Sequence, residues 1–181
     1  MTARAIQFID THSHLQVERL DGHRAQWLAQ AREAGLENIL LCAGAPEDWE
    51  RTLSAAHEWG LGAMLGIHPL WLDSTTPAEL VGLRELAESL LDDPHFIGLG
   101  EVGLDGFEPG LDQHKAEQVF LEELKIARDL DLPLSIHVRR TASKTLGLLR
   151  RVYGSPGKTG FQPVVSCCSM NGSLRSNSGT L

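Results

Sequence analysis

Short apolar segments alternate with longer amphipathic segments along most of the chain. The short segments have the length and apolar character of buried strands, and they lie at residues 5–9, 38–42, 61–67, 96–100 and 134–137. The longer segments repeat apolar residues at helical spacing, and they lie at residues 21–33, 47–59, 77–91, 112–130 and 141–152. This order predicts five strand–helix units with parallel strands and right-handed crossovers.

Two α/β architectures fit this alternation. A closed (β/α) barrel has eight units and about 250 residues as a rule, whereas this chain has 181 residues. The pattern therefore predicts an incomplete TIM-like barrel of about five to six units, with the last strands missing. The alternative is an open, doubly wound parallel sheet, which would be complete at this length.

The end of the chain differs in composition from the rest. After Tyr153 the chain becomes rich in Gly, Ser and Pro, and only Val164 and Val165 suggest a sixth strand. Residues 1–153 are therefore predicted to form one partial barrel domain, and residues 154–181 an irregular, disordered tail.

Composition and charge narrow the classes of function. No apolar run approaches the roughly 20 residues that span a bilayer, and no signal peptide is recognisable, so a cytoplasmic protein without membrane contact is expected. The three cysteines form no disulfide framework. The net charge is −8, but no acidic residue follows Asp131, whereas seven Lys and Arg do. A nucleic-acid substrate would therefore need metals or a few local arginines for its attraction.

Histidine and acidic side chains gather where predicted strands end. His12 and His14 follow the first strand, and residues i and i+2 of an extended chain point to the same side. His68, Glu101 and His137 lie at the ends of the third, fourth and fifth strands. Imidazole and carboxylate are common metal ligands, and the carboxyl ends of strands are where α/β proteins place their sites.

Each of these residues also has a purely structural interpretation. Glu101 could be an N-cap or a solvated acid of a loop, His137 could be a hydrogen-bonded core histidine, and Asp105 could cap a turn or orient a metal ligand. Arg139 could pair with a surface acid or, beside a metal, bind a phosphate. The glycines at 98, 100 and 103 could form a tight turn or admit a ligand. The remaining histidines are interpreted as structural or exposed: His23, His57, His95 and His114.

The motifs together resemble the TatD family of metal-dependent deoxyribonucleases and hydrolases, within the amidohydrolase-like barrels. The resemblance covers residues 6–152. Its four matching stretches, in the order and at the spacing of the family, are Phe8-Ile-Asp-Thr-His-Ser-His14, Gly66-Ile-His-Pro69, Gly98-Leu-Gly-Glu-Val-Gly-Leu-Asp105 and Leu132-Pro-Leu-Ser-Ile-His-Val-Arg139.

The resemblance implies a TIM-like barrel with two divalent cations, Mg²⁺, Mn²⁺ or Zn²⁺. It implies that His12 and His14 hold one cation, that His137 holds the other, and that Glu101 bridges both. A water activated by the cations would attack a phosphodiester of DNA or a similar substrate. His68 and Arg139 would contact the phosphate or assist proton transfer. Asp105 completes the candidate catalytic group.

The sequence also departs from the family pattern. The family has a further His after the sixth strand and an Asp after the eighth, whereas this chain has no His after 137 and no Asp after 131. By its spacing Cys168 lies near the missing histidine, and a thiolate can ligate zinc. The loss of acids and of periodicity suggests a disturbed reading frame near Gly160.

Three hypotheses of function follow. The first is a phosphodiester hydrolase acting on DNA. The second is the same metal chemistry on a small ester or amide, because barrels of this kind support many substrates. The third is a catalytically inactive fragment that binds metal. No protein partner and no oligomeric state follow from the sequence.

Overall fold

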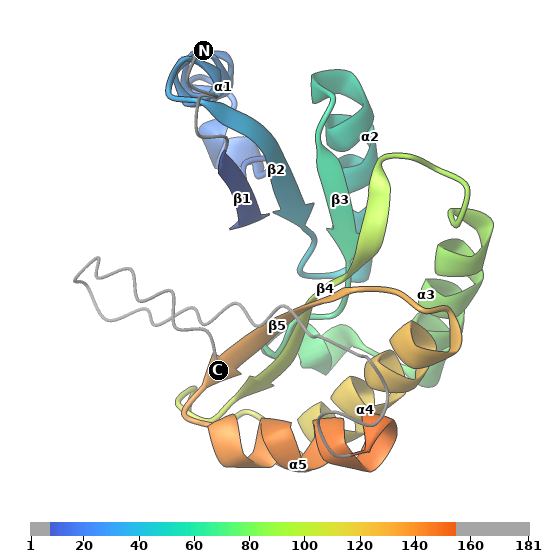
Figure 1. Cartoon of the computed structure of the whole chain (residues 1–181). Helices are drawn as coiled ribbons and strands as arrows, with labels where there is room; N and C mark the ends of the chain where they lie inside the picture. The colour runs from blue at the N-terminus through green and yellow to red at the C-terminus, as the bar shows by residue number, and fades with distance from the viewer. Residues whose placement is uncertain (1–7, 155–181) are drawn as a thin grey trace, which may run out of the picture.

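The computed structural model describes residues 8–154, in which five parallel strands alternate with helices (Figure 1). The strands are β1 (Phe8–Ser13), β2 (Leu36–Cys42), β3 (Gly62–Leu65), β4 (Phe96–Asp105) and β5 (Leu134–Arg139). The α-helices are α1 (Arg24–Glu33), α2 (Trp49–Trp59), α3 (Pro77–Ser89), α4 (Gln113–Asp129) and α5 (Ala142–Tyr153). Three short 3-10 helices are η1 (Glu18–Leu20), η2 (Pro46–Asp48) and η3 (Pro69–Ser74).

The strands are hydrogen-bonded in chain order, β1-β2-β3-β4-β5, and every pair is parallel. A doubly wound sheet reverses its strand order at a switch point, and this sheet has no such reversal. The sheet curves, with helices along its outer side (Figure 1). The prediction of an incomplete TIM-like barrel is therefore confirmed, with five units within residues 8–154. The predicted start of the first strand, the sixth strand and the tail lie outside these residues.

The predicted end of the fourth strand at residue 100 is wrong, because β4 continues to Asp105. The glycines interpreted as a turn lie inside the strand, where they let β4 approach its neighbour. A Cβ on Gly103 would lie 2.2 Å from the His137 carbonyl oxygen, and the φ of Gly103 is +138°. The register of β4 against β5 also shifts between Leu99 and Val102. Glu101 therefore lies within a strand, at the point where the register shifts, and its backbone N–H donates to the Ala43 carbonyl at 2.8 Å.

The main core lies between the outer side of the sheet and the helices. Its centre is formed by α4, β4 and β5, with Leu99, Phe120, Leu124, Leu134 and Ile136 completely buried. Each such side chain contributes roughly 1.5–3 kcal/mol through removal from water. At β1, in contrast, Phe8 and Ile9 are 52% and 59% exposed. The core therefore fixes β4 and β5 more firmly than β1.

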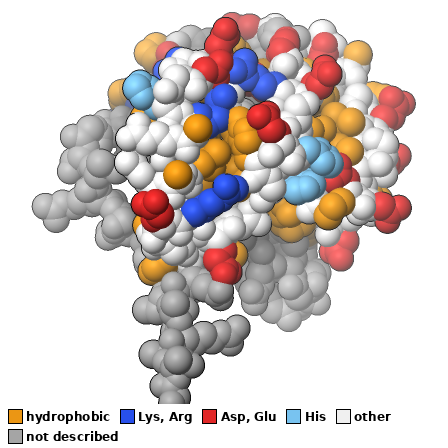
Figure 2. Space-filling model, turned by 90° about the horizontal axis from the view of Figure 1, so that it is seen from above, with side chains coloured by type: hydrophobic (Ala, Val, Ile, Leu, Met, Phe, Trp, Pro, Cys, Tyr) orange, Lys and Arg blue, Asp and Glu red, His pale blue; other side chains and the backbone are white. Residues whose placement is uncertain are grey.

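The surface carries both signs of charge. Seen from above Figure 1, the side from which β1, β2 and β3 begin, acidic and basic side chains surround a band of hydrophobic ones (Figure 2). Within residues 8–154, no helix combines the length and the apolar character needed to cross a membrane.

Glu123 is a completely buried carboxyl group on the sheet-facing side of α4. Its Oε1 accepts a hydrogen bond from the backbone N–H of Ile67 at 2.8 Å, and its Oε2 has no partner. Burial raises the pKa of Glu123 well above its ordinary value, and the Ile67 hydrogen bond offsets this only in part. The Trp49 indole N–H donates to the Gly66 carbonyl at 3.0 Å. Two outer helices thus fix the segment that leads to His68.

Gly103→Ala should destabilise the fold by about 3 kcal/mol or more, because the new methyl group would overlap the β5 backbone at a φ that suits only glycine. Gly147→Ala is the matched control, since nothing lies within 4 Å of its Cβ position in α5 and alanine favours the helix. Urea unfolding of both variants measures the difference. Equal midpoints for the two variants would contradict the close β4–β5 approach.

Glu123→Gln should make stability less dependent on pH. The pKa of Glu123 is higher in the folded state than in the unfolded chain. Its contribution to the free energy of unfolding is therefore fully present below the ordinary pKa of 4.5, and it falls as the pH rises towards the folded-state pKa. The glutamine side-chain oxygen can still accept the hydrogen bond from the Ile67 N–H, and the amide does not titrate. The variant should exceed the wild type in stability at pH 8, by about 1.4 kcal/mol for each pH unit of pKa elevation, and match it near pH 4.5.

Thermal unfolding at pH 5 and pH 8 tests this expectation. Glu122→Gln, at the exposed neighbouring position that pairs with Lys125, should leave the pH dependence unchanged. Parallel pH profiles of the wild type and Glu123→Gln would show that the buried carboxyl group does not retain its proton.

Candidate metal centre

The fold brings together four imidazoles and one carboxylate from four parts of the sheet. His12 lies in β1 and His14 directly after it, Glu101 lies in β4 and His137 in β5. His68 follows β3 as the N-cap of η3. The predicted convergence of these side chains on one place is therefore what the structure shows.

Glu101 lies at the centre, and its two oxygen atoms face different imidazoles. Oε2 is 3.2 Å from Nε2 of both His12 and His14. Oε1 is 2.9 Å from Nδ1 of His137 and 3.6 Å from Nε2 of His68. Within residues 8–154, these contacts define two groups that could hold a metal ion, His12–His14–Glu101 and His68–Glu101–His137. One carboxylate is shared between both groups.

Hydrogen bonds behind the first group set which nitrogen of each imidazole faces Glu101. The His14 Nδ1–H donates to the Cys42 carbonyl at 2.8 Å, so Nε2 is the nitrogen that faces inward and could offer its lone pair to a cation. Nδ1 of His12 lies 2.8 Å from the Ser135 hydroxyl, which leaves its Nε2 beside that of His14 at 3.3 Å. Partners of this kind orient metal-bound histidines, so the first group fits a cation.

His137 is held between two carboxylates. Its Nε2 is 3.0 Å from Oδ2 of Asp105, while its Nδ1 faces Glu101. Asp105 is completely buried, and its other oxygen accepts hydrogen bonds from the backbone N–H groups of Phe107 and Glu108. Asp105 therefore orients His137 from behind, so that Nδ1 can serve as a ligand.

His68 differs from the other imidazoles, because a donor rather than an acceptor lies behind it. The backbone N–H of Leu70 donates to Nδ1 of His68 at 3.1 Å. A neutral imidazole with an accepting Nδ1 carries its proton on Nε2, the atom that faces Glu101. Burial lowers the pKa of His68 to about 4, so the ring is neutral at pH 7. His68 thus presents a hydrogen-bond donor to the centre instead of a lone pair.

The charges within the cluster stabilise one another. Burial acts to raise the pKa of Glu101, but the hydrogen bonds of His12, His137 and His14 outweigh it and hold the pKa far below its ordinary value. The hydrogen bond to Glu101 raises the pKa of His14. Burial lowers the pKa of His137, but Glu101 and Asp105 reverse that effect and raise it. The carboxylate is ionised at neutral pH and provides a strong attraction for a cation.

Arg139 lies at the edge of the cluster. Its Nη1 is 3.5 Å from Oδ2 of Asp105, and its guanidinium carbon lies 3.9 Å from the ring centroid of Phe107. The side chain is half-buried rather than free on the surface. The interpretation of Arg139 as a partner of a surface acid is therefore wrong, because its partner is buried and orients His137.

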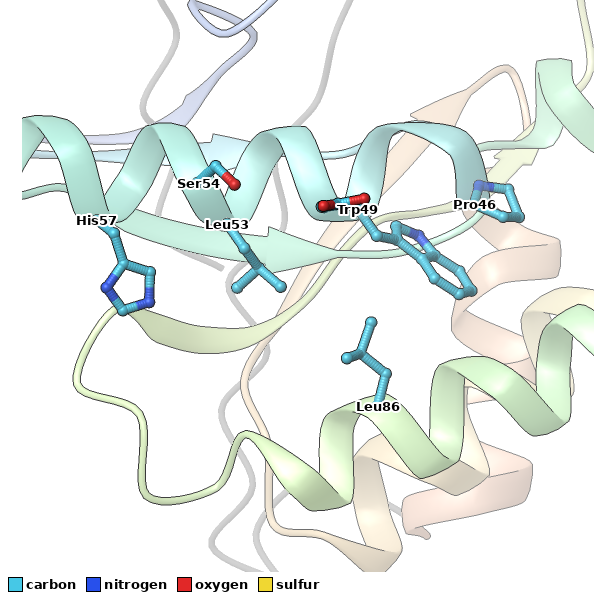
Figure 3. A pocket seen from close by; sticks show the side chains of 7 residues that line it. Pro46, Trp49, Leu53, Ser54, His57 and Leu86 are labelled. Carbon is cyan, nitrogen blue, oxygen red and sulfur yellow. The ribbon is translucent and has the colours of Figure 1, made fainter.

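The other histidines lie apart from this centre, as predicted. His57 in α2 bonds Asp93 at 2.8 Å, and His95 bonds the Leu61 carbonyl at 2.7 Å. His57 also lines a groove of about 500 Å³ between α2 and α3, into which apolar side chains of both helices point (Figure 3). This groove lies on the outer side of the sheet and shares no residue with the cluster.

Sequence analysis named Asp105 as a residue that could orient a ligand, but it missed the groups that orient His12 and His14. Ser135 was detectable, because it lies two positions before His137 in an extended strand and shares its side. The role of the Cys42 carbonyl was not detectable, because every residue has a backbone carbonyl and the sequence does not indicate which one accepts this hydrogen bond. Gln16 was also missed; its amide donates to the same carbonyl at 2.8 Å.

Comparisons with known proteins agree with this geometry. YjjV of Escherichia coli K12, described as an uncharacterized metal-dependent hydrolase, is 33% identical over 147 residues, which cover 80% of this chain and 56% of YjjV. The 3'-5' ssDNA/RNA exonuclease TatD of Cronobacter turicensis is 28% identical over 141 residues, covering 77% and 52% of the two chains. The chain thus spans little more than half the length of these relatives.

The crystal structure of YjjV superimposes with a TM-score of 0.74 at 32% identity, covering 80% of this chain and 55% of that one. The family model of the TatD related DNases matches residues 9–169. This range includes every residue of the cluster. Sequence, fold and family model agree, and the chain belongs to the TatD related DNase family.

Proposed function

We propose that this chain carries the metal centre of a hydrolase that cleaves phosphodiester bonds in nucleic acid. The observation that supports the proposal best is the position of Glu101, whose two oxygens face two separate sets of imidazoles. A carboxylate in that position can bridge two cations. The names of the relatives, a metal-dependent hydrolase and a DNA and RNA exonuclease, agree with this chemistry.

The donors divide between two cations. His12, His14 and Oε2 of Glu101 would hold the first, because both imidazoles present their Nε2 atoms at 3.2 Å from that oxygen. Oε1 of Glu101 and Nδ1 of His137 would hold the second. Three imidazoles with one carboxylate suit Zn²⁺ or Mn²⁺ better than Mg²⁺, which prefers oxygen ligands.

The bound cations would lower the pKa of a water and stabilise the entering and leaving oxygens of the phosphodiester. The residues of the chain supply positioning and protons. His68 directs its Nε2–H towards the centre and can donate to a phosphate oxygen or to the leaving group. Arg139 provides a guanidinium beside His137, in the geometry that suits an anionic substrate.

The charge distribution favours a phosphodiester over a neutral ester or amide. The chain is net acidic at −8, which opposes general attraction of nucleic acid. Nevertheless Arg139 ends β5 and lies 3.5 Å from Asp105, the residue behind His137, and no acidic residue follows Asp131. A neutral substrate would gain no charge attraction from this guanidinium.

Glu101→Gln should abolish binding of both cations, because the bridging carboxylate loses its charge. His12→Ala and His137→Ala should each reduce the stoichiometry from two cations to one. Isothermal titration with Mn²⁺ and Zn²⁺ measures the number of bound cations. Hydrolysis of bis(p-nitrophenyl) phosphate and of single-stranded DNA should fall by about 100-fold or more in all three variants.

Glu85→Gln is the matched control, since Glu85 is an exposed carboxylate on α3. This variant should keep both cations and full activity. If Glu101→Gln still bound two cations, the bridging role would be wrong. Turnover of p-nitrophenyl acetate without any cleavage of DNA would instead favour a small ester as the substrate.

His68→Ala should lower hydrolysis by about 10²- to 10⁴-fold, the usual contribution of a positioned proton donor. The same variant should still bind two cations. In the wild type the Leu70 N–H donates to Nδ1 of His68, so Nε2 carries the proton and offers no lone pair to a cation. Mn²⁺ titration and phosphodiesterase assays on one preparation separate these effects. Loss of one cation together with activity would make His68 a ligand rather than a donor.

A further inference from the structure

A second hollow, of about 710 Å³, is lined by residues that directly follow β4 and β5 in the chain. It lies between the loop after β4 and the first turn of α5, and it begins at Gly106, the residue after Asp105. Its walls include Gly106, Glu108, Leu111, Arg140, Thr141 and Lys144. None of these residues belongs to the two groups around Glu101. The volume is in the range of pockets that hold a small ligand or one nucleotide.

The two walls of this hollow are tied together by close backbone contacts. The Gly106 N–H donates to the Arg139 carbonyl at 2.7 Å. A Cβ on Gly106 would lie 3.0 Å from Thr141 Cγ2 and 3.1 Å from the Arg140 carbonyl oxygen. The Thr141 hydroxyl donates to the Leu104 carbonyl at 3.0 Å. The position of the hollow relative to the centre is therefore fixed by the strands themselves.

Two guanidiniums and one ring connect the hollow to the centre. The Phe107 ring, which is partly exposed, lies 3.9 Å from the Arg139 guanidinium carbon and 4.4 Å from that of Arg140. Arg139 in turn contacts Asp105, which orients His137. A continuous path of contacts thus leads from the cluster to the hollow.

Of the three cationic side chains at or beside the hollow, Arg139, Arg140 and Lys144, only Arg140 is available to bind an anion. Arg139 faces Asp105, and Lys144 bonds Glu117 at 2.6 Å. Arg140 is exposed and makes no ion pair with any carboxylate of residues 8–154, the nearby Glu108 included. Its guanidinium lies over the Phe107 ring, and this contact holds it beside the hollow.

The backbone of Arg140 has a left-handed conformation, with φ of 57°. A non-glycine residue pays roughly 1–2 kcal/mol for this conformation, and glycine adopts it freely. The backbone at this position therefore gains nothing from arginine. Replacement by glycine removes the guanidinium without disturbing the chain, which separates binding from stability.

We propose that Arg140 and the hollow beside it bind the phosphate group next to the phosphodiester at the metal centre. The inference rests on the proposed function and narrows its substrate to a nucleotide strand with at least two consecutive phosphates. Phe107 holds the guanidinium in place, and the hollow accepts the attached nucleotide. A substrate with a single phosphodiester reaches the centre without touching Arg140.

Binding of a fluorescein-labelled ten-residue oligothymidylate to the full chain, measured by anisotropy in EDTA from 50 to 200 mM salt, tests the proposal. Arg140→Gly and Arg140→Gln should each weaken binding about tenfold at the lowest salt and reduce the salt slope by about 0.7, the value for one phosphate of a single strand. Arg150→Gln, with the same charge change at the far end of α5, should leave both unchanged.

Two further measurements complete the test. Arg140→Gly should unfold at or above the wild-type temperature, and its KM for bis(p-nitrophenyl) phosphate should equal that of the wild type. Equal weakening by Arg140→Gly and Arg150→Gln, or no oligothymidylate binding by the wild type, would overturn the proposal. So would a matching loss of bis(p-nitrophenyl) phosphate turnover, because Arg140 would then act at the centre. A wild-type chain that binds the strand but never cleaves it would contradict the proposed function alone.

Discussion

The arrangement of the site depends on one buried carboxylate. Glu101 is 3% exposed, and an ionised group in that position costs several kcal/mol unless partners compensate it. Imidazoles from β1 and β5 and from the end of β3 surround it, so four separate parts of the sheet must keep their places for its charge to be stable. The charge that attracts a cation is therefore the same charge that fixes the relative position of the strands.

The atoms behind each imidazole then decide what that imidazole can do. A carbonyl stands behind His14 and a carboxylate behind His137, and each accepts a hydrogen bond from the outer nitrogen, so the inward nitrogen is the one that can offer a lone pair to a cation. A backbone N–H stands behind His68, so its inward nitrogen holds the proton. In the proposed function, therefore, chemically identical side chains divide into metal ligands and a proton donor through their outer hydrogen bonds. Distance alone would place His68 among the ligands.

Much of this arrangement was predictable from the sequence, and the remainder has identifiable physical reasons. The alternation of strands and helices gave the fold class, and the spacing of His12 and His14 gave their common direction. The length of β4 was not predictable, because its glycines have the local signature of a turn and become strand residues only through contact with β5. Glu123 was missed for a similar reason. An acidic residue in a helix is expected to face solvent, and only the packing of α4 against the sheet shows that this one is buried.

The position of β1 shows how the site and the fold support each other. β1 pairs with β2 on one side, and its apolar residues Phe8 and Ile9 remain more than half exposed, so packing contributes little to its position. Its firmest links across the interior are polar: His12 reaches Ser135 of β5 and Glu101 of β4. A cation between His12, His14 and Glu101 would add to these links, because ligand binding to the folded state stabilises it. In this chain, therefore, the side chains of the cluster also link β1 to β4 and β5 across the interior of the sheet.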